Sequence, residues 1–315
     1  MTPFLLALIG PTAVGKTAIS LPLAEALGAE IISVDSRQVY RYLDVGADKI
    51  SPEVRRRIPH HLIDVVDPDE PFSAADFVAR TTDAVERIRR RGRTPLLVGG
   101  TPFYYAALAE RTLTPDLPRD WNLRAHLEEE AQKEGREALY RRLAERDPDY
   151  AGRIHPHDLR RVVRGLEILE LSGKPPTQIY REGGRKEGAF ALSYLGLTRP
   201  REELYRGIAR RATAQFSAGF PEEVEMLLSR GYDPRCPALQ GFGYRELVRY
   251  HRGECTLEDA LVGDIAATKA FSRRQMTWFR KFTPVLWYDL SVEEEEEALR
   301  HMVDLCRQRM EDGTT

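Results

Sequence analysis

The sequence predicts an α/β fold, in which helices flank a parallel sheet and an all-helical domain is inserted into the chain. Apolar runs with the length and residue types of buried strands recur at 4–9, 30–34, 95–98, 190–197 and 285–288. Segments of helix-forming residues separate these runs, as expected where helices connect parallel strands. Between 113 and 188 only helical segments remain, at 121–133, 136–145 and 158–171. We therefore expect a core domain formed by 1–112 and 189–315, and a helical domain formed by 113–188.

The first strand leads directly into a glycine-rich turn with the spacing of a phosphate-binding loop, or P-loop. The turn comprises Gly10, Pro11, Thr12, Ala13, Val14, Gly15, Lys16 and Thr17, and a helix is expected from 18 to 27. Glycines let the backbone curl so that N–H groups face one point, where the helix N-terminus adds partial positive charge. Lys16 supplies a full charge, and the Thr17 hydroxyl can ligate Mg²⁺. The motif predicts binding of a diphosphate or triphosphate without specifying the molecule that carries it.

The second strand ends at Asp35, which is followed by Ser36, Arg37 and Gln38. Ligands of open parallel sheets lie at the carboxyl ends of the strands, so Asp35 and the P-loop are expected to share one crevice. A carboxylate in that crevice could accept a proton or orient a nucleophile. A turn or helix-capping role explains an aspartate at this position equally well, and both interpretations stay open.

The strand at 95–98 ends in Gly99, Gly100 and Thr101, without an acidic residue. Many nucleotide hydrolases carry an aspartate at the end of such a strand to organise Mg²⁺. Its absence weakens an ATPase or GTPase interpretation but leaves small-molecule kinases open. Thr101 is expected to donate a hydrogen bond in the crevice or to cap the helix at 103–108, and the two roles are compatible.

Basic and aromatic residues cluster in the second half of the chain. Arg160, Arg161 and Arg164 lie three and four residues apart, so they share one helix face, for which solvation is the usual explanation. The segment Leu239–Arg245 combines glycines with an aromatic ring and a cation, which suits either nucleotide stacking with phosphate contact or a plain turn. Arginine-rich helices are expected at 199–217 and 259–282.

The net charge of the 315-residue chain is −2, which by itself argues against nucleic-acid binding. From Leu290 to Thr315, however, eight acidic and three basic residues give −5, so the rest of the chain carries +3. A basic face is therefore compatible with the composition. The three cysteines are far apart, and the adjacent His60 and His61 lack further ligands at metal spacing. No apolar run approaches the length of a membrane span, so we expect a cytoplasmic protein without membrane contact.

A set of motifs in fixed order resembles the tRNA dimethylallyltransferase family. The motifs are the P-loop, Asp35–Tyr40, Ile58–Asp64, Phe72–Phe77, Gly99–Thr101, Arg153–Pro156, Gly241–Arg245 and Arg274–Phe279. The resemblance covers residues 4 to about 282. It implies transfer of a dimethylallyl group from its diphosphate to the exocyclic N6 amine of an adenosine, with release of diphosphate. That adenosine lies 3′-adjacent to the anticodon in tRNAs that read codons beginning with U.

The resemblance also implies roles for individual residues. Asp35 would take the proton of the amine, Thr101 would lie near the diphosphate and the reacting base, and Lys16 would stabilise the leaving group. The P-loop and Arg211 would bind the diphosphate of dimethylallyl diphosphate, with Mg²⁺ on Thr17. The protein is expected to act as a monomer.

The implied partner is the anticodon stem–loop of a tRNA, with the target base flipped into a channel. The residues that match tRNA-contacting stretches of the family are Asp35, Ser36, Arg37, Gln38, Thr101, Arg124, Arg160, Arg161, Arg164, Gly243, Tyr244 and Arg245. The helical domain would then clasp the stem–loop, whose bases and backbone would be recognised by shape, stacking and phosphate contacts.

Three other functions compete with this one. An adenylate isopentenyltransferase would perform the same chemistry on a free nucleotide, but it would not need the arginine face of the helical domain. A small-molecule or nucleotide kinase would use the same P-loop to bind ATP and would be indifferent to tRNA. A non-catalytic RNA-binding switch would use nucleotide as a signal, and replacing Asp35 would leave its function intact.

Overall fold

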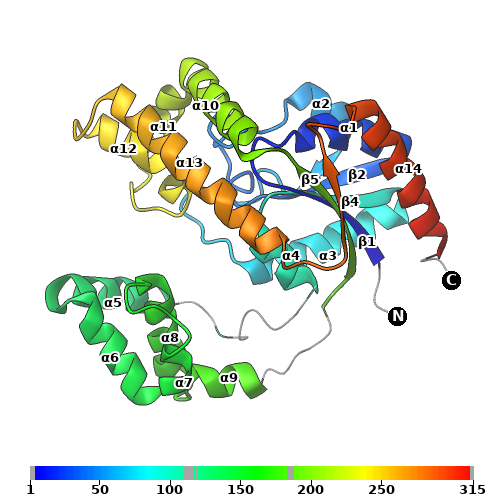
Figure 1. Cartoon of the computed structure of the whole chain (residues 1–315). Helices are drawn as coiled ribbons and strands as arrows, with labels where there is room; N and C mark the ends of the chain where they lie inside the picture. Colours follow the sequence, from blue (N-terminus) through cyan, green and yellow to red (C-terminus); the bar gives the residue numbers. More distant parts are fainter. Residues whose placement is uncertain (1–3, 110–116, 118–119, 183–187, 313–315) are drawn as a thin grey trace. The chain divides into compact units, whose positions relative to one another are not determined.

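The computed structural model describes residues 4–109, 117, 120–182 and 188–312 (Figure 1). Contacts within the chain divide it into two compact units. The first, called the sheet unit below, comprises Met1–Ala109 and Ala189–Thr315, and the second, called the helical unit, comprises Glu110–Gly188. The predicted boundary between 112 and 113 lies outside the described residues.

The sheet unit contains a six-stranded parallel sheet with the strand order β3-β2-β4-β1-β5-β6, which confirms the predicted α/β class. Its strands are β1 (Phe4–Ile9), β2 (Ala29–Val34), β3 (His60–His61), β4 (Thr94–Gly99), β5 (Ala191–Thr198) and β6 (Val285–Asp289). Only β3 was not predicted, because two residues are too short to give a strand pattern. The register pairs Gly99 with both Ile9 and Val34, so β1, β2 and β4 end in one row.

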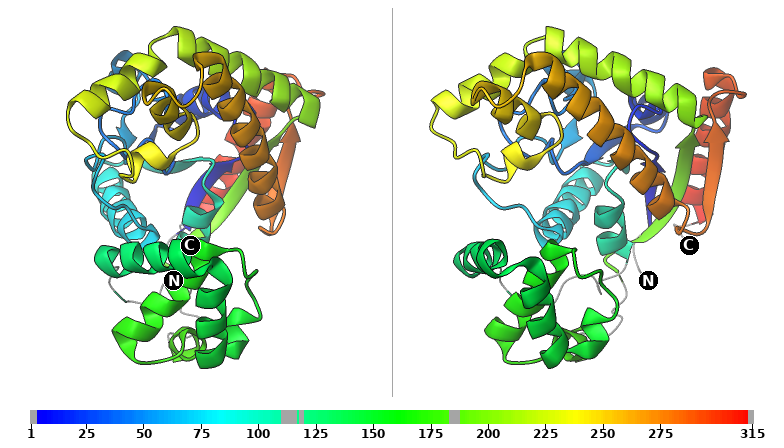
Figure 2. Two further views of the ribbon diagram at one scale, coloured as in Figure 1. Left: turned by 90° about the vertical axis from the view of Figure 1, so that its left-hand side faces the viewer. Right: turned by 60° about the vertical axis from the view of Figure 1, so that its left-hand side comes forward.

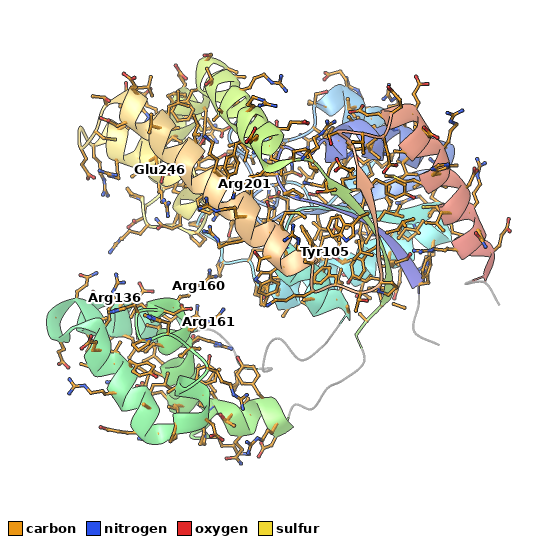
Figure 3. All side chains as sticks on the ribbon, viewed as in Figure 1. Tyr105, Arg136, Arg160, Arg161, Arg201 and Glu246 are labelled. Atoms are coloured by element: carbon orange, nitrogen blue, oxygen red, sulfur yellow. The ribbon has the colours of Figure 1, made fainter. Side chains whose placement is uncertain are left out.

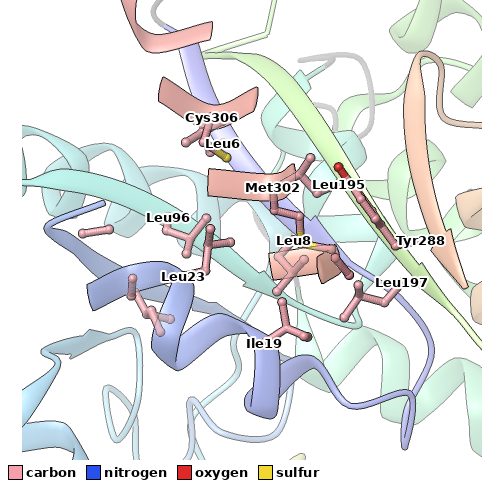
Figure 4. Close-up of a cluster of buried hydrophobic side chains, with 14 of the residues drawn as sticks. Leu6, Leu8, Ile19, Leu23, Leu96, Leu195, Leu197, Tyr288, Met302 and Cys306 are labelled. Atoms are coloured by element: carbon pink, nitrogen blue, oxygen red, sulfur yellow. The ribbon is translucent and has the colours of Figure 1, made fainter. Parts of the chain in front are cut away.

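One face of the sheet is covered by α1 (Lys16–Ala26) and α14 (Glu295–Asp312), as Figure 4 shows. Leu6 and Leu8 of β1 point to this face because side chains alternate along a strand. They pack against Leu23 of α1 and Met302 of α14 in one buried cluster. Burial of each such side chain contributes about 1.5–3 kcal/mol. This packing fixes α1 and the P-loop that precedes it relative to the strands.

The opposite face is covered by α3 (Ala74–Arg90) and α4 (Pro102–Ala109). Phe77 of α3 stacks on Tyr104 of α4 with ring centroids 4.2 Å apart. Tyr105 of α4 contacts the ring of Tyr194 in β5, whose side chain points away from the α1 face. The N-terminus of α3 is fixed by a reciprocal capping box between Ser73 and Asp76.

The described residues of the sheet unit form further helices besides these four. They are α2 (Pro52–Arg57), α10 (Arg201–Ser217), α11 (Phe220–Ser229), α12 (Tyr244–His251) and α13 (Leu257–Phe279), with a 3-10 turn at Ala238–Gln240. Both views of Figure 2 show α10 and α13 running side by side, in agreement with their contacts. A second buried cluster joins α11 and α12 to the loop that follows β2. The sequence analysis did not predict α2, α11 or α12.

The helical unit consists of α5 (Trp121–Glu134), α6 (Arg136–Arg146), α7 (Pro148–Ala151), α8 (Leu159–Ser172) and α9 (Pro176–Glu182). The three longest match the predicted helices. Its core contains Leu127, Leu143, Val162 and Leu166, which α5, α6 and α8 contribute. Across both units, none of the helices in the described residues is long and apolar enough to span a membrane.

Candidate active site at the carboxyl edge of the sheet

The P-loop connects the end of β1 to α1. Ala13 (φ 63°) and Gly15 (φ 106°) adopt the left-handed backbone region, so the chain turns sharply twice before the helix begins at Lys16. Backbone turns of this kind form concave groups of N–H donors that bind anions. The helix dipole of α1 adds to this preference because its N-terminus lies at the same place.

Lys16 folds back onto the loop that carries it. Its ammonium nitrogen Nζ donates to the carbonyl oxygens of Gly10 at 3.0 Å and Pro11 at 2.8 Å. Burial, together with the charge of Arg211, lowers the pKa of Lys16 to about 8, although the charges of Asp35 and Asp48 oppose this shift. An anion bound in the loop would favour the protonated form, since a nearby opposite charge stabilises a cation.

Gln275 of α13 joins two of the strand ends. Its Oε1 accepts a hydrogen bond from the Thr12 amide at 2.9 Å, and its Nε2 donates to the Gly100 carbonyl at 2.5 Å. A side chain at residue 100 would place Cβ 2.5 Å from this Nε2, so a larger residue there would have to displace the Gln275 amide. The sequence analysis did not assign a role to Gln275. No local pattern indicates that a glutamine inside a basic helix bonds the Thr12 amide and the Gly100 carbonyl.

Arg211 of α10 also reaches the P-loop. Its Nη2 donates to Thr12 Oγ1 at 2.7 Å, and its Nη1 lies 3.3 Å from Asp48 Oδ2. Its Nε is buried without a hydrogen-bond partner in the described parts of the chain. An unsatisfied buried donor beside the P-loop suits an anionic ligand, because leaving it unpaired costs about 1–3 kcal/mol.

Asp35 shapes the turn after β2 and also borders the cavity. Its Oδ1 accepts hydrogen bonds from the backbone amides of Arg37 at 2.7 Å and Gln38 at 3.3 Å, so it shapes the turn after β2. Its Oδ2 makes no hydrogen bond to any described residue. Asp35 also lines a cavity with the P-loop. One carboxylate oxygen therefore holds the turn, and the other is available to a ligand.

The cavity has a volume of about 600 Å³ and lies at the row of strand ends. Its charged lining comprises Lys16, Arg210 and Arg211 together with two carboxylates, Asp35 and Asp48. Gly99 and Gly100 line it as well, and Thr101 follows them directly. The Thr101 hydroxyl makes no hydrogen bond within the described residues, although its carbonyl accepts from the Tyr104 amide at 3.1 Å as α4 begins. An excess of cations makes the cavity suited to an anion.

The loop that carries Asp48 is held from several sides. Buried Glu223 of α11 accepts hydrogen bonds from the amides of Asp44, Val45 and Gly46 at 2.6, 2.7 and 3.1 Å. Gln38 donates through Nε2 to the Asp48 carbonyl at 3.2 Å. The amide of Gln38, expected to contact tRNA, is therefore engaged in positioning this loop.

Two further residues expected to contact tRNA are also engaged within the protein. The ring of Tyr244 is 1% exposed, and its hydroxyl donates to Glu223 Oε1 at 2.8 Å. This ring is not accessible for direct contact with RNA, because it belongs to the buried cluster of α11 and α12. Arg37 donates through Nη1 to the carbonyls of Pro237 and Ala238 at 2.9 and 3.2 Å. By contrast, Ser36 is partly exposed and Arg245 is exposed.

The arginines of the helical unit fall into two groups. Arg124 and Arg164 both pair with Glu167, whose side chain is fully buried, and Arg124 Nη2 lies 2.6 Å from Glu167 Oε2. Arg160 and Arg161 are exposed at the start of α8 (Figure 3). The expectation of one common arginine face therefore needs correction, because Arg164 is committed to an internal ion pair.

The candidate metal ligand Thr17 lies in the first turn of α1, and its hydroxyl makes no hydrogen bond to a described residue. No group of three or more histidine, cysteine or acidic side chains that could hold a metal is found among the described residues. This donor set fits Mg²⁺, which keeps water ligands and usually takes few protein ligands beside phosphate oxygens.

These features define a P-loop protein whose site suits a phosphorylated ligand. The P-loop lies at the carboxyl edge of a parallel sheet and borders a cationic cavity, into which Asp35 brings one free carboxylate oxygen. Residues 38–282 match the sequence model of the family described as IPP transferase. The chain belongs to this family.

Relatives and solved structures agree with this assignment. The chain is 46% identical to a tRNA dimethylallyltransferase of Symbiobacterium thermophilum over 97% of its length and 95% of the relative. It is 44% identical to the enzyme of the same description from Thermomicrobium roseum, over 95% and 90% of the two chains. The tRNA isopentenylpyrophosphate transferase of Bacillus halodurans superimposes with a TM-score of 0.72 at 38% identity, covering 99% and 98% of the two chains. A eukaryotic dimethylallyltransferase acting on tRNA gives a TM-score of 0.81 at 26% identity, covering 98% and 80%.

Proposed function

We propose that the protein transfers a dimethylallyl group from dimethylallyl diphosphate to the N6 amine of the adenosine 3′-adjacent to the anticodon, in tRNAs that read codons beginning with U. The observation that carries this proposal is the cavity in which Asp35, with one free oxygen, faces the same space as the P-loop. The family membership of the chain and the descriptions of its relatives support the choice of donor and acceptor.

The leaving group is diphosphate, which suits a cradle built for phosphates. Lys16, the P-loop amides and Arg211 would stabilise negative charge that develops on the departing oxygen. The unpaired Nε of Arg211 is a donor still to be satisfied. A Mg²⁺ ion held by Thr17 would supply additional positive charge to the diphosphate oxygens. The binding of inorganic diphosphate is expected to be competitive with dimethylallyl diphosphate.

The nucleophile is a weak one, because the lone pair of the adenine amine is delocalised into the ring. Asp35 would accept a hydrogen bond from this amine through Oδ2 and take its proton as the new N6–carbon bond forms and the carbon–oxygen bond to diphosphate breaks. Thr101, next to the cavity, would donate its free hydroxyl to the base or to the diphosphate. Asp35 Oδ1 is already held by two amides, so the carboxylate is fixed before the substrate binds.

The RNA partner would be the anticodon stem–loop of a tRNA. Its target base must leave the stack before it can enter the cavity. Exposed Arg160 and Arg161 of the helical unit and Arg245 of the sheet unit are the side chains best suited to phosphate contacts. We propose a monomer that works in the cytoplasm, a compartment that suits three free cysteines.

A transfer assay tests the proposal. The protein is mixed with Mg²⁺, labelled dimethylallyl diphosphate and a stem–loop with adenosine 3′ to the anticodon, with AMP and ATP as parallel acceptors. Label is expected on the RNA alone. The variant D35N keeps an oxygen for the Arg37 and Gln38 amides but removes the proton acceptor, so it should fold normally and lose transfer. Label on AMP would instead indicate a free-nucleotide enzyme, and consumption of ATP without any label would indicate a kinase.

A further inference from the structure

One arginine ties the P-loop to the C-terminal part of the sheet unit. Arg199 directly follows β5, and its Nε donates to the Val14 carbonyl at 3.2 Å. Its Nη1 donates to the Leu290 carbonyl at 2.7 Å, just after β6, and its Nη2 donates to Glu295 Oε1 at 3.0 Å in the first turn of α14. Because the guanidinium is planar and its donors have a fixed geometry, it holds these three segments in one arrangement.

The Val14 carbonyl depends on this arginine. Val14 is fully buried in the P-loop, and among the described residues only Arg199 donates to its carbonyl. The nearest helical hydrogen bond, from the Ile19 amide at 3.3 Å, goes to the Gly15 carbonyl instead. A buried carbonyl without a donor is unfavourable, so the guanidinium stabilises the orientation in which the Val14 carbonyl faces it.

The same peptide group carries the Gly15 amide. In a planar trans peptide the C=O of one residue and the N–H of the next point in opposite directions. The Gly15 N–H is therefore directed away from Arg199. Gly15 lines the cavity together with Lys16, and its N–H makes no hydrogen bond to any described residue. An amide that is free at the start of a helix is a donor for a bound anion.

Glycine by itself does not fix this orientation. Gly15 has φ 106°, and a residue without Cβ resists rotation of the preceding peptide only weakly. The second anchor of Arg199 is better fixed, because the Leu290 amide donates to the Thr198 carbonyl at 3.1 Å at the end of β5. Arg199 therefore connects a mobile type of peptide to a backbone segment that the sheet holds in place.

We propose that Arg199 is a positioning residue for the diphosphate site, because it keeps the peptide between Val14 and Gly15 turned so that the Gly15 N–H faces the anion. The identity of the anion rests on the proposed function. The pair with Glu295 is secondary, because that side chain is 52% exposed and exposed ion pairs contribute little. The C-terminal segment thus acts on the P-loop mainly through the Leu290 carbonyl.

The experiment compares R199M and R199K with the unaltered protein. The dissociation constant of inorganic diphosphate is measured by calorimetry with Mg²⁺ present, and KM is measured separately for dimethylallyl diphosphate and for the RNA stem–loop. The Gly15 amide is followed by NMR in protein labelled only at its 23 glycines, which keeps the spectrum simple enough to assign. Urea unfolding reports the stability of each variant.

Two controls separate the peptide contact from other effects. R89M also removes an arginine that donates to a backbone carbonyl, that of Phe4 at 2.7 Å, but at the start of β1 rather than at the P-loop end. E295Q removes the ion pair of Arg199 and leaves both of its carbonyl bonds in place.

R199M should weaken the binding of inorganic diphosphate about tenfold, as for partial loss of one hydrogen bond to a charged group, and should raise KM for dimethylallyl diphosphate by the same factor. KM for RNA should not change. R199K keeps a cation that can reach one carbonyl, so it should recover part of the loss. Diphosphate should shift the Gly15 amide resonance in the unaltered protein and shift it less in R199M. Both controls should bind diphosphate within about twofold of the unaltered protein.

Failure of this inference differs from failure of the proposed function. If the unaltered protein labels RNA while R199M binds diphosphate equally well, the role of Arg199 is wrong and the proposed function stands. Equal losses for diphosphate and RNA in R199M would indicate general damage to the fold, and a loss in E295Q as large as in R199M would assign the effect to the ion pair. Either result overturns the inference. If R199M binds diphosphate about tenfold more weakly but the unaltered protein labels no RNA, Arg199 still positions an anion site and the proposed function is wrong.

Discussion

The amide of Gln275 offers the sharpest test of how the site is held together. It is the only described side chain that bonds both the Thr12 amide and the Gly100 carbonyl, and it is 2% exposed. The variant Q275M keeps the shape of the side chain but removes both hydrogen bonds. The Thr12 amide and the Gly100 carbonyl would then lack a partner, and each unsatisfied group costs about 1–3 kcal/mol. Because water from the cavity can bond to them in part, we take a combined cost of about 2 kcal/mol.

If this free energy is lost in the transition state, kcat/KM for dimethylallyl diphosphate should fall about 30-fold, since 1.4 kcal/mol corresponds to a factor of ten. Q275E keeps an acceptor for Thr12 but adds negative charge beside an anion site, so it should raise KM for the diphosphate substrate more than Q275M does. Steady-state kinetics with saturating RNA measures both constants. The control is Q308M, an exposed position on α14. A folded Q275M protein with kinetics within about twofold of the parent would refute the argument that the P-loop depends on this amide.

Three further predictions concern charge. E167Q leaves two arginines beside a buried neutral group and should destabilise the helical unit by about 3–5 kcal/mol in urea unfolding. The two arginines hold the pKa of Glu167 below its usual value against the opposing effect of burial, so this stabilisation is present at neutral pH and lost as pH falls through the depressed pKa. Equal unfolding midpoints for E167Q and the unaltered protein would contradict the predicted destabilisation. Because burial lowers the pKa of Lys16 to about 8, kcat/KM should fall as pH rises above about 8. D48A removes a carboxylate that raises this pKa, so the decline should begin at lower pH, and an unmoved pH profile would exclude that coupling. R160A should weaken RNA binding without changing the unfolding midpoint, whereas R164A should lower the midpoint because it breaks the Glu167 pair. Equal midpoints for the two variants would argue against the division of the arginines into two groups.

Local signals in the sequence were sufficient for most of the fold. The apolar runs gave the strands, because burial on both faces demands continuous apolar side chains. The P-loop was predictable since its spacing and flanks are set by backbone geometry within eight residues. Short elements such as β3 and α12 were missed, because two to eight residues carry too little periodicity.

Pairwise contacts across the sequence were not predictable in the same way. The helical period places Arg164 near both Arg160 and Glu167, but it does not show that Glu167 is buried and that Arg164 pairs with it. The sequence Gly-Phe-Gly-Tyr suggests an aromatic loop for RNA, yet the ring of Phe242 is partly exposed and that of Tyr244 is buried on α12. Which ring faces solvent depends on the packing of α11 and α12.

The sequence alone therefore determined the class of fold, the phosphate site and, through the order of its motifs, the family. The class of fold and the phosphate site depend on residues that are close together in the chain. The family depends on the order of the motifs, which can be read from the sequence alone. The tertiary structure decided the assembly of the site: Gln275 meets Thr12 across 263 residues, and Asp48 faces Arg211 across 163. Such contacts follow from strand register and helix packing, which no local pattern encodes. Asp35 illustrates both levels, because the sequence placed it at a strand end and the structure showed which of its oxygens holds the turn and which is free.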